Sequence, residues 1–296
     1  MELGKRKMVL GVFVLFCSVM FGARRYSLRP EERGARGRVT LQPFLADSLK
    51  NTGIAVVVCP GGSYSWHDMK NEGVAVARWL QENGINAYVL RYRVATVAAY
   101  VTGFRALGVG NKYPDMLEDV EDALAYVYSH QVEDGVDTSM IGVMGFSAGG
   151  HLAVSSFVYN RGRWKPKFVG AIYPVVTMSD GRYVHKRSRR GALGVWGQYD
   201  KVMRDSLSLE RHITGGCPPV FLVNCVDDDV VRYENSVVLD SALTREGVPH
   251  VYLQYKVGGH GFGASDVKGS EECRRWKNEF LKWIMKVKDE SLVEDI

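Results

Sequence analysis

The sequence predicts an α/β fold with a mostly parallel sheet whose two faces are both covered by helices. Runs that are apolar throughout and rich in β-branched residues alternate with segments of helical periodicity, which is the pattern of strands buried on both faces. The composition, 46% hydrophobic and 24% charged in 296 residues, is that of a globular protein and excludes collagen, coiled coil and disorder. Because no repeat and no Pro/Ser/Gly-rich linker follows residue 40, residues 39–296 are expected to form one domain.

Residues 1–23 form a segment of their own, which we interpret as an export signal. A basic run at 5–7 precedes an uncharged apolar stretch from Met8 to Ala23, which is short for a bilayer span of roughly 20 residues and about as long as a signal-peptide core. Met20 and Phe21 are bulky where a cleavage site prefers small residues, so a cleaved signal peptide and an uncleaved N-terminal anchor both remain open. Either one predicts an exported protein, periplasmic or secreted, and the anchor adds attachment to a membrane.

Residues 24–38 are rich in arginine and glycine without periodicity, so they are predicted to be a linker, with a basic contact patch as the alternative. The formal net charge of the chain is +5, and Lys5, Arg6 and Lys7 against Glu2 account for +2 of it. The remaining excess is too small, for a domain of this size, to indicate a nucleic acid or an acidic polymer as partner.

The predicted elements of the first half alternate between strand and helix. Alternating apolar residues predict a first strand over 39–44, and a β-branched apolar run predicts a second over 54–58. Apolar residues at helical spacing, ended by a glycine, predict a helix over 72–83, and a strand over 86–90 follows it. Four apolar residues on one face predict a helix over 113–131.

The second half continues this alternation. A strand over 140–144 runs directly into the glycine-rich turn 145–149, and a helix is predicted from there to Phe157. Two stretches, 94–112 and 178–206, have no clean period and are expected to lie over the carboxyl edge of the sheet, where ligands bind in such folds. The remaining elements are apolar strands and amphipathic or glycine-ended helices: strands over 168–173, 220–223 and 251–255, and helices over 234–246 and 270–287.

The turn 145–149 has the pattern G-x-S-x-G between a predicted strand and a predicted helix. A sharp turn here forces the central residue into a strained backbone conformation, and the flanking glycines remove Cβ atoms that would clash. Ser147 then lies at a helix N-terminus, whose orphan N–H groups favour a developing negative charge. Ser147 is therefore the predicted nucleophile, and a serine N-cap in a glycine-rich turn is the alternative.

A serine hydroxyl needs a base to accept its proton, and seven histidines are available. His260 lies in the run Val-Gly-Gly-His-Gly-Phe-Gly directly after the last predicted strand, where a glycine-rich loop can carry it over the nucleophile. It is the predicted base. His151, four residues after Ser147 on the same helix, is expected to be structural.

The base needs an acid that fixes its tautomer, and in hydrolases of this topology the acid follows a late strand. Asp227, Asp228 and Asp229 all come shortly after the apolar run that begins at Val220. One of them should be buried against His260, but the local pattern does not choose among the three.

Backbone N–H groups are expected to hold the oxyanion that forms when a carbonyl carbon is attacked. One donor is the residue after the nucleophile, Ala148. The others are expected from the glycine-rich turn Cys-Pro-Gly-Gly-Ser-Tyr at 59–64, with Gly62 and Ser63 as donors and Gly61 shaping the turn. A plain tight turn is the alternative.

Nothing in the pattern requires a metal or an organic cofactor. No cysteine or histidine spacing resembles a metal site, and five cysteines do not make a disulfide framework in a chain of this length. Cys217 and Cys225 lie at the two ends of an extended run of eight residues, which spans about 26 Å. They are therefore too far apart to be bonded to each other.

Together these segments resemble the α/β-hydrolase esterases of the acetylxylan-esterase type, which are carbohydrate esterases related to the hormone-sensitive-lipase-like group. The resemblance implies an eight-stranded sheet and removal of acyl groups from ester-decorated sugars. Members read Asp-x-x-Val-Pro-x-Glu-Asn/Gln-Ser after the late strand, and this pattern laid on the chain makes Asp228 the acid. The resemblance covers about residues 50–287 and is carried by Pro60–Tyr64, Leu90–Arg93, Tyr113–Pro114 with Asp119, Gly145–His151, Tyr173–Pro174 with His185 and Ser188, and Gly258–Phe262.

The predicted function is that of a serine carboxylic-ester hydrolase that deacetylates carbohydrates such as xylan or xylo-oligosaccharides, with Ser147, His260 and Asp228 as its triad. The expected partner is a small-molecule or oligosaccharide ester, membrane contact is expected only through the N-terminal segment, and the oligomeric state is open. A general short-chain esterase or lipase, a prolyl-oligopeptidase-like serine peptidase and a noncatalytic binding protein on the same fold are the alternatives.

Overall fold

The computed structural model describes residues 25–29, 39–95 and 110–294. The predicted signal peptide or anchor, 1–23, therefore lies outside the described residues, as do most of the predicted linker, 24–38, and most of the irregular stretch 94–112. Within the described ranges, no helix is both long enough and apolar enough to cross a membrane.

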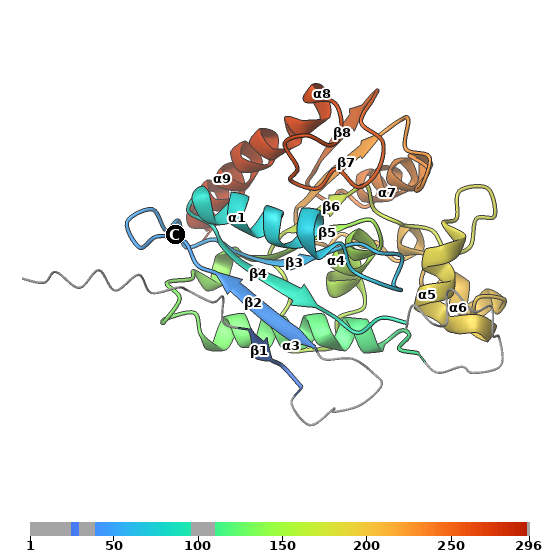
Figure 1. Cartoon of the computed structure of the whole chain (residues 1–296), viewed down its shortest axis with the longest axis horizontal. Helices are drawn as coiled ribbons and strands as arrows, with labels where there is room; N and C mark the ends of the chain where they lie inside the picture. The colour runs from blue at the N-terminus through green and yellow to red at the C-terminus, as the bar shows by residue number, and fades with distance from the viewer. Residues whose placement is uncertain (1–24, 30–38, 96–109, 295–296) are drawn as a thin grey trace, which may run out of the picture.

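Eight strands in the described residues form one sheet in the order β1-β2-β4-β3-β5-β6-β7-β8 (Figure 1). Strands β3 to β8 run parallel to one another, whereas β2 is antiparallel to both β1 and β4. The eight-stranded, mostly parallel sheet implied by the resemblance is present. The strands are β1 (Tyr26–Ser27), β2 (Thr40–Phe44), β3 (Ala55–Cys59), β4 (Asn86–Arg91), β5 (Ile141–Phe146), β6 (Val169–Ile172), β7 (Val220–Cys225) and β8 (His250–Tyr255).

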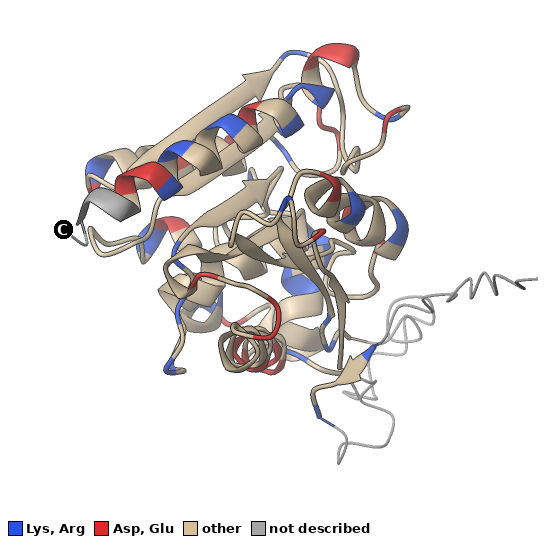
Figure 2. Ribbon diagram, turned by 90° about the vertical axis from the view of Figure 1, so that its left-hand side faces the viewer, with Lys and Arg blue, Asp and Glu red and all other residues tan. Residues whose placement is uncertain are grey.

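Helices cover both faces of the sheet, as predicted. Two separate apolar cores follow, because successive strand residues point to opposite faces. In Figure 2 the strands are almost free of charged residues, which colour the helices and loops instead. One face is covered by α3 (Asp115–Ser129), α4 (Ala148–Val158) and α7 (Glu234–Arg245), and the other by α1 (Ala75–Glu82), α8 (Glu271–Arg274) and α9 (Trp276–Glu294).

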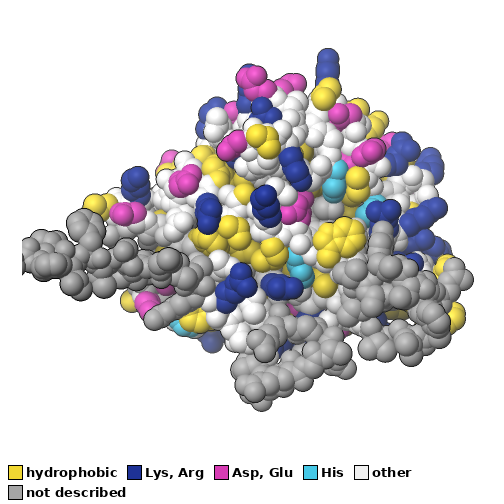
Figure 3. Space-filling model, in the orientation of Figure 1, with side chains coloured by type: hydrophobic (Ala, Val, Ile, Leu, Met, Phe, Trp, Pro, Cys, Tyr) yellow, Lys and Arg dark blue, Asp and Glu magenta, His cyan; other side chains and the backbone are white. Residues whose placement is uncertain are grey.

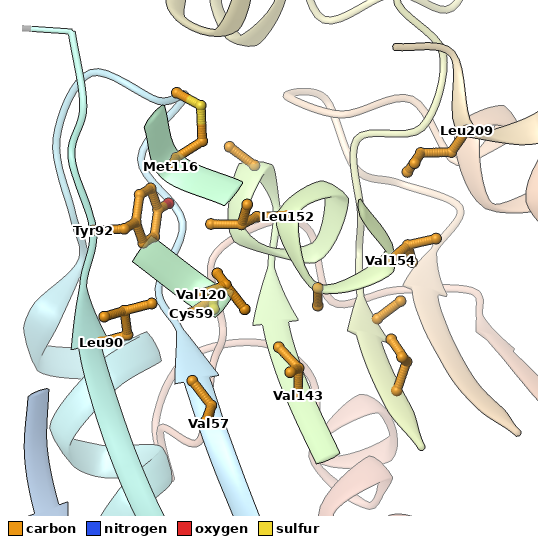
Figure 4. Packing of buried hydrophobic residues seen from close by; sticks show 14 of the residues in the cluster. Val57, Cys59, Leu90, Tyr92, Met116, Val120, Val143, Leu152, Val154 and Leu209 are labelled. Atoms are coloured by element: carbon orange, nitrogen blue, oxygen red, sulfur yellow. The ribbon is translucent and has the colours of Figure 1, made fainter. Parts of the chain in front are cut away.

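The core under α3 and α4 shows how the apolar pattern becomes packing. Figure 4 shows Val57 and Val143, from neighbouring strands, beneath Val120 of α3 and Leu152 of α4. These side chains are fully buried, and each contributes about 1.5–3 kcal/mol relative to an exposed position. The sheet is therefore held rigidly enough to fix the loops that leave its carboxyl edge.

Two sequence expectations are corrected. Tyr26 and Ser27, within the predicted linker, form β1 and pair with Leu41 and Thr40 of β2. Two residues are too few to show a period, so the pattern could not reveal this strand. The stretch 178–206 is also not irregular throughout, because it contains two helices. The periodicity of α5 (Lys186–Gly197) is interrupted at Gly194, which is non-helical, and α6 (Lys201–Ser206) is too short to show a period.

Two predicted helices have different boundaries in the structure. The helix expected over 72–83 begins as a π-helix, η1 (Met69–Val74), which continues directly into α1. The last helix is divided into α8 and α9, and α9 continues past residue 287 to Glu294.

A buried ion pair fastens the end of β4 to α3. Asp119, which is inaccessible to solvent, accepts the backbone N–H of Arg93 at 2.6 Å and its Nε–H at 2.8 Å. The Arg93 guanidinium also contacts Glu118 at 3.0 Å, and Arg29, two residues after β1, lies 3.5 Å from Asp119. The carboxylate therefore joins three segments of the chain.

We expect Asp119→Asn to lower the free energy of unfolding by about 3 kcal/mol, because it removes the fully buried carboxylate from the buried Arg93 guanidinium and leaves only partly exposed carboxylates such as Glu118 beside it. Urea denaturation measures the change. Glu279→Gln is the control, since it breaks a largely exposed Lys282–Glu279 pair worth less than about 1 kcal/mol. Equal effects of the two substitutions would contradict this assignment.

Candidate active site

Ser147 occupies the sharp turn between β5 and α4. Its φ and ψ are 55° and −118°, a conformation that L residues rarely adopt and that the surrounding packing must maintain. A Cβ atom on Gly145 would collide with the carbonyl oxygen of Gly149, and one on Gly149 would collide with the carbonyl of Cys59 at the end of β3. The two glycines of the motif are therefore required by close backbone approaches on both sides of Ser147.

The structure brings Ser147, His260 and Asp228 together although they are far apart in the sequence. The Oγ of Ser147 lies 2.9 Å from Nε2 of His260, and Nδ1 of His260 lies 2.6 Å from Oδ2 of Asp228. In the neutral imidazole, Nδ1–H donates to Asp228 and Nε2 accepts from the serine hydroxyl. This tautomer leaves His260 ready to receive the Ser147 proton.

The three aspartates that the local pattern left open have different surroundings. Asp228 is 6% exposed, and its second oxygen accepts the N–H groups of Val230 and Val231 at 2.9 and 2.8 Å. Asp227 instead accepts the backbone N–H groups of residues 258 and 259, and Asp229 is exposed. Contact with His260 thus belongs to Asp228, the aspartate that the resemblance selects.

The segment 258–264, called the base loop from here on, carries His260 from the end of β8. Gly259 and Gly261 have φ of 63° and 74°, which place the loop in the left-handed region on both sides of the histidine. Asp227 holds the N–H groups of Gly258 and Gly259 at 2.9 and 2.8 Å. Asp227, which the sequence offers only as a competing acid, therefore anchors the loop that bears His260.

The segment 60–64, called the oxyanion loop from here on, follows β3 and lies against Ser147. A Cβ on Gly61 would be 2.9 Å from the Cβ of Ser147, and Gly62 and Ser63 have φ of 138° and 55°. Within the described ranges, the N–H groups of Gly62, Ser63 and Ala148 have no hydrogen-bond acceptor. These three groups, predicted as donors to an oxyanion, are therefore available beside the nucleophile.

His151 has the structural role expected of it. Its two ring nitrogens lie 2.8 Å from the Tyr64 hydroxyl and 2.9 Å from the Leu207 carbonyl oxygen. Burial lowers the pKa of His151 to about 4, so the ring stays neutral at physiological pH. It thereby ties the first turn of α4 to the oxyanion loop.

The surroundings of the triad are polar. His185, at the start of α5, bonds to the Ser188 hydroxyl at 2.8 Å, and burial together with the nearby His260 lowers its pKa to about 4. Figure 3 shows many Lys and Arg side chains on the right-hand side of this face, where Figure 1 places α5, α6 and α7. Polar and basic side chains therefore lie on the side of the triad where α5 begins.

Two residues of the site were not predicted as functional. Glu72 was taken as the first residue of a helix, and Tyr173 as the last of a strand and as part of the Tyr173–Pro174 pair of the resemblance, with no chemical role assigned to either. Both are buried beside the triad. Their contacts are described below.

A cavity of about 820 Å³ lies elsewhere, at the amino ends of β5, β6 and β7. Ser139, Lys167 and Pro219 are among the residues that line it. The six residues of β5 separate it from Ser147 by about 20 Å, so it takes no part in the chemistry of the triad. In the described part of the chain, no three or more His, Cys, Asp or Glu side chains are grouped so as to hold a metal ion.

The sequence matches a known protein family over the part of the chain that contains Ser147, Asp228 and His260. The family profile described as alpha/beta hydrolase fold matches residues 106–264, more than half of the chain. The chain belongs to the α/β-hydrolase family. The fold class predicted from the sequence is thereby confirmed.

Two curated relatives of this α/β hydrolase come from bacteria. An acetylxylan esterase of Xylanibacter ruminicola is 31% identical over 232 residues, which are 77% of this chain and 44% of the relative. An endo-1,4-beta-xylanase B of Butyrivibrio fibrisolvens is 30% identical over 217 residues, 70% of this chain and 32% of the relative. The chain thus spans less than half the length of these two relatives.

A solved structure is similar over nearly its whole length. The acetyl ester-xyloside bifunctional hydrolase of Caldicellulosiruptor lactoaceticus superposes with a TM-score of 0.77 at 27% identity, covering 90% of this chain and 96% of that one. The resemblance drawn from the sequence, to esterases of the acetylxylan-esterase type, is confirmed by these relatives.

The geometry predicts that Ser147 reacts with a fluorophosphonate probe whatever the natural substrate is, because its proton has an acceptor and the N–H groups beside it can bind the phosphonyl oxygen. Peptide mass spectrometry should place the label on Ser147. His260→Ala should abolish labelling, while Ser188→Ala should leave it unchanged. Labelling of another serine at the same rate would refute the prediction.

Proposed function

We propose that this α/β hydrolase is a serine carboxylic-ester hydrolase that removes acetyl groups from carbohydrates such as acetylated xylan or xylo-oligosaccharides. The observation that carries the proposal is the continuous hydrogen-bond chain from Ser147 through His260 to Asp228 at the strained turn. The named activities of its similar proteins, an acetylxylan esterase and an acetyl ester-xyloside hydrolase, support the choice of acetylated sugars.

The first half of the reaction forms an acyl-enzyme. Ser147 Oγ attacks the ester carbonyl carbon while its proton passes to His260 Nε2. The carbonyl oxygen becomes an oxyanion, which the N–H groups of Gly62, Ser63 and Ala148 stabilise. When the tetrahedral intermediate collapses, the C–O bond to the sugar breaks and His260 gives its proton to the departing alcohol.

The second half releases the acid. Neutral His260 removes a proton from a water molecule, which attacks the acyl carbon of the acyl-enzyme, and the same N–H groups hold the second oxyanion. Ser147 leaves as the alcohol after His260 returns the proton. Throughout, Asp228 keeps Nδ1 protonated and stabilises the imidazolium, so each step needs only groups that the chain supplies.

Other functions on this site are less well supported. A serine peptidase or a lipase could use the same triad, but the acetylxylan esterase and the acetyl ester-xyloside bifunctional hydrolase that resemble this chain are both named for acetyl esters. The polar and basic segment 178–190 also offers little apolar surface to a long acyl chain. We therefore place a general short-chain esterase second.

The substrate class can be tested by the acetate released from acetylated xylan, with p-nitrophenyl acetate, butyrate and octanoate measured in parallel. We expect release from the xylan and a fall in kcat/KM as the acyl chain lengthens, because an acetyl group is small and the surroundings of the triad are polar. Ser147→Ala should remove all of these activities. Faster hydrolysis of octanoate than of acetate would favour a lipase instead.

The two neighbouring aspartates are expected to differ in how strongly their substitution lowers kcat. Asp228→Asn should lower kcat by about 10³–10⁴-fold, because an amide in this place favours the wrong tautomer of His260. Asp227→Asn is its matched control and should cost much less, since it weakens only the anchoring of the base loop. A larger loss in Asp227→Asn would exchange their roles.

Export is a separate part of the proposal, supported by the basic run at 5–7 and the apolar stretch from Met8 to Ala23. We expect the protein in its own host to be found outside the cytoplasm, either with its first residues removed or attached to a membrane. Fractionation followed by N-terminal mass spectrometry measures both. An intact Met1 in a soluble cytoplasmic fraction would refute export.

A further inference from the structure

The side chain of Glu72 connects the two loops of the site. Its Oε2 accepts the N–H of Gly61 at 2.7 Å, and its Oε1 accepts the hydroxyl of Tyr173 at 2.8 Å. The Tyr173 oxygen accepts in turn the N–H of Gly263 at 2.9 Å. Three hydrogen bonds therefore link Gly61, next to the oxyanion donors, with Gly263, three residues after the base.

Packing reinforces this link. Ala264, at the end of the base loop, donates its N–H to the carbonyl of Asn71, the residue before Glu72, at 3.2 Å. The ring of Tyr173 lies against the His260 ring with 4.6 Å between centroids and an angle of 56° between planes. The base loop thus rests on η1, which carries Glu72, and on Tyr173 at the end of β6.

The hydrogen-bond partners of Glu72 suit a carboxylate, and its burial carries a cost to stability. Both of its hydrogen-bond partners are donors, a pattern that suits an oxygen pair that only accepts. The side chain is 3% exposed, and burial raises the pKa of Glu72. Across the described residues, no lysine or arginine forms an ion pair with it, and His260 is the nearby group that can become cationic. A structural role alone would be filled as well by a neutral residue.

We propose that Glu72 is a positioning residue, which holds the oxyanion loop and the base loop in fixed relation around Ser147 through Tyr173. The proposal rests on the proposed function, because this relation matters only if Ser147 attacks an ester. The donors and the base come from loops after β3 and β8, so no local geometry sets their separation. A displacement of about 1 Å between them is enough to slow the reaction about 100-fold.

The test uses substitutions that keep the shape of the side chains. In Glu72→Gln, the amide offers one acceptor oxygen for two donors, so one hydrogen bond of the link is lost. We expect kcat for p-nitrophenyl acetate to fall by about 10-fold or more with KM changed less than about twofold, because Glu72 does not contact the ester. The melting temperature should stay equal or rise, since the cost of burying a charge is removed.

Tyr173→Phe should lower kcat to a similar degree, because it breaks the same link at its midpoint. The double variant should be little worse than the more damaged single variant, as expected for two residues of one chain of hydrogen bonds. The matched controls are Glu210→Gln and Tyr128→Phe. Burial also raises the pKa of Glu210, and the Tyr128 hydroxyl donates to carbonyl oxygens at the amino edge of the sheet. Both controls should keep the wild-type kcat.

The split between kcat and KM separates positioning from a general loss of stability. A displaced base loop or oxyanion loop slows the chemical step even at saturating substrate, so kcat, measured well below the melting temperature, should fall while KM changes less than about twofold. A merely structural role would lower the melting temperature or the yield of folded protein and leave kcat per folded molecule unchanged.

The outcomes are distinct. An active wild type in which Glu72→Gln and Tyr173→Phe both keep kcat within about twofold overturns the positioning role and leaves the proposed function intact. A loss of kcat that only follows a lower melting temperature overturns it as well. A wild type that hydrolyses no ester overturns the proposed function and the positioning role together. If Glu72→Gln does not fold, Tyr173→Phe decides between these results.

Discussion

The close approach of the backbone at the start of α4 to the end of β3 is the constraint on which the site depends. It is possible only because Gly145 and Gly149 have no Cβ, and it forces Ser147 into its strained conformation. The same approach places the Ala148 N–H beside the oxyanion loop. A single packing contact in the centre of a parallel sheet therefore sets both the position of Ser147, the proposed nucleophile, and that of the proposed oxyanion donors.

Carboxylates give these glycine-rich loops their rigidity. Glycine has the largest conformational freedom to lose, so a loop built from it needs external support. Asp227 holds two N–H groups of the base loop, and Glu72 holds one of the oxyanion loop. Asp228 accepts two from its own loop while it faces His260. Each of these three acidic groups thus orders backbone, and of the three only Asp228 also contacts His260.

The sequence predicts the chemistry better than it predicts the support. Ser147, His260 and the donors of the oxyanion loop stand in short glycine-containing motifs, in which glycine is needed for a tight turn or a close backbone approach. The structure brings these motifs together. The local pattern could not choose Asp228 from its neighbours, because burial against a histidine 32 residues away is a tertiary property. The same reason hides Glu72 and Tyr173, whose partners come from other strands. Strand β1 and helices α5 and α6 were missed because their patterns are too short or are broken by glycine.

The parallel sheet also places Ser147, His260 and Asp228 at one edge of the molecule and leaves the opposite edge without them. All the groups of the triad leave from carboxyl ends of strands, about 20 Å from the amino edge. Exposed Arg163, Lys165 and Lys167 stand at that amino edge. A surface contact made through this amino edge would therefore leave the carboxyl edge, with Ser147, His260 and Asp228, open to the solution.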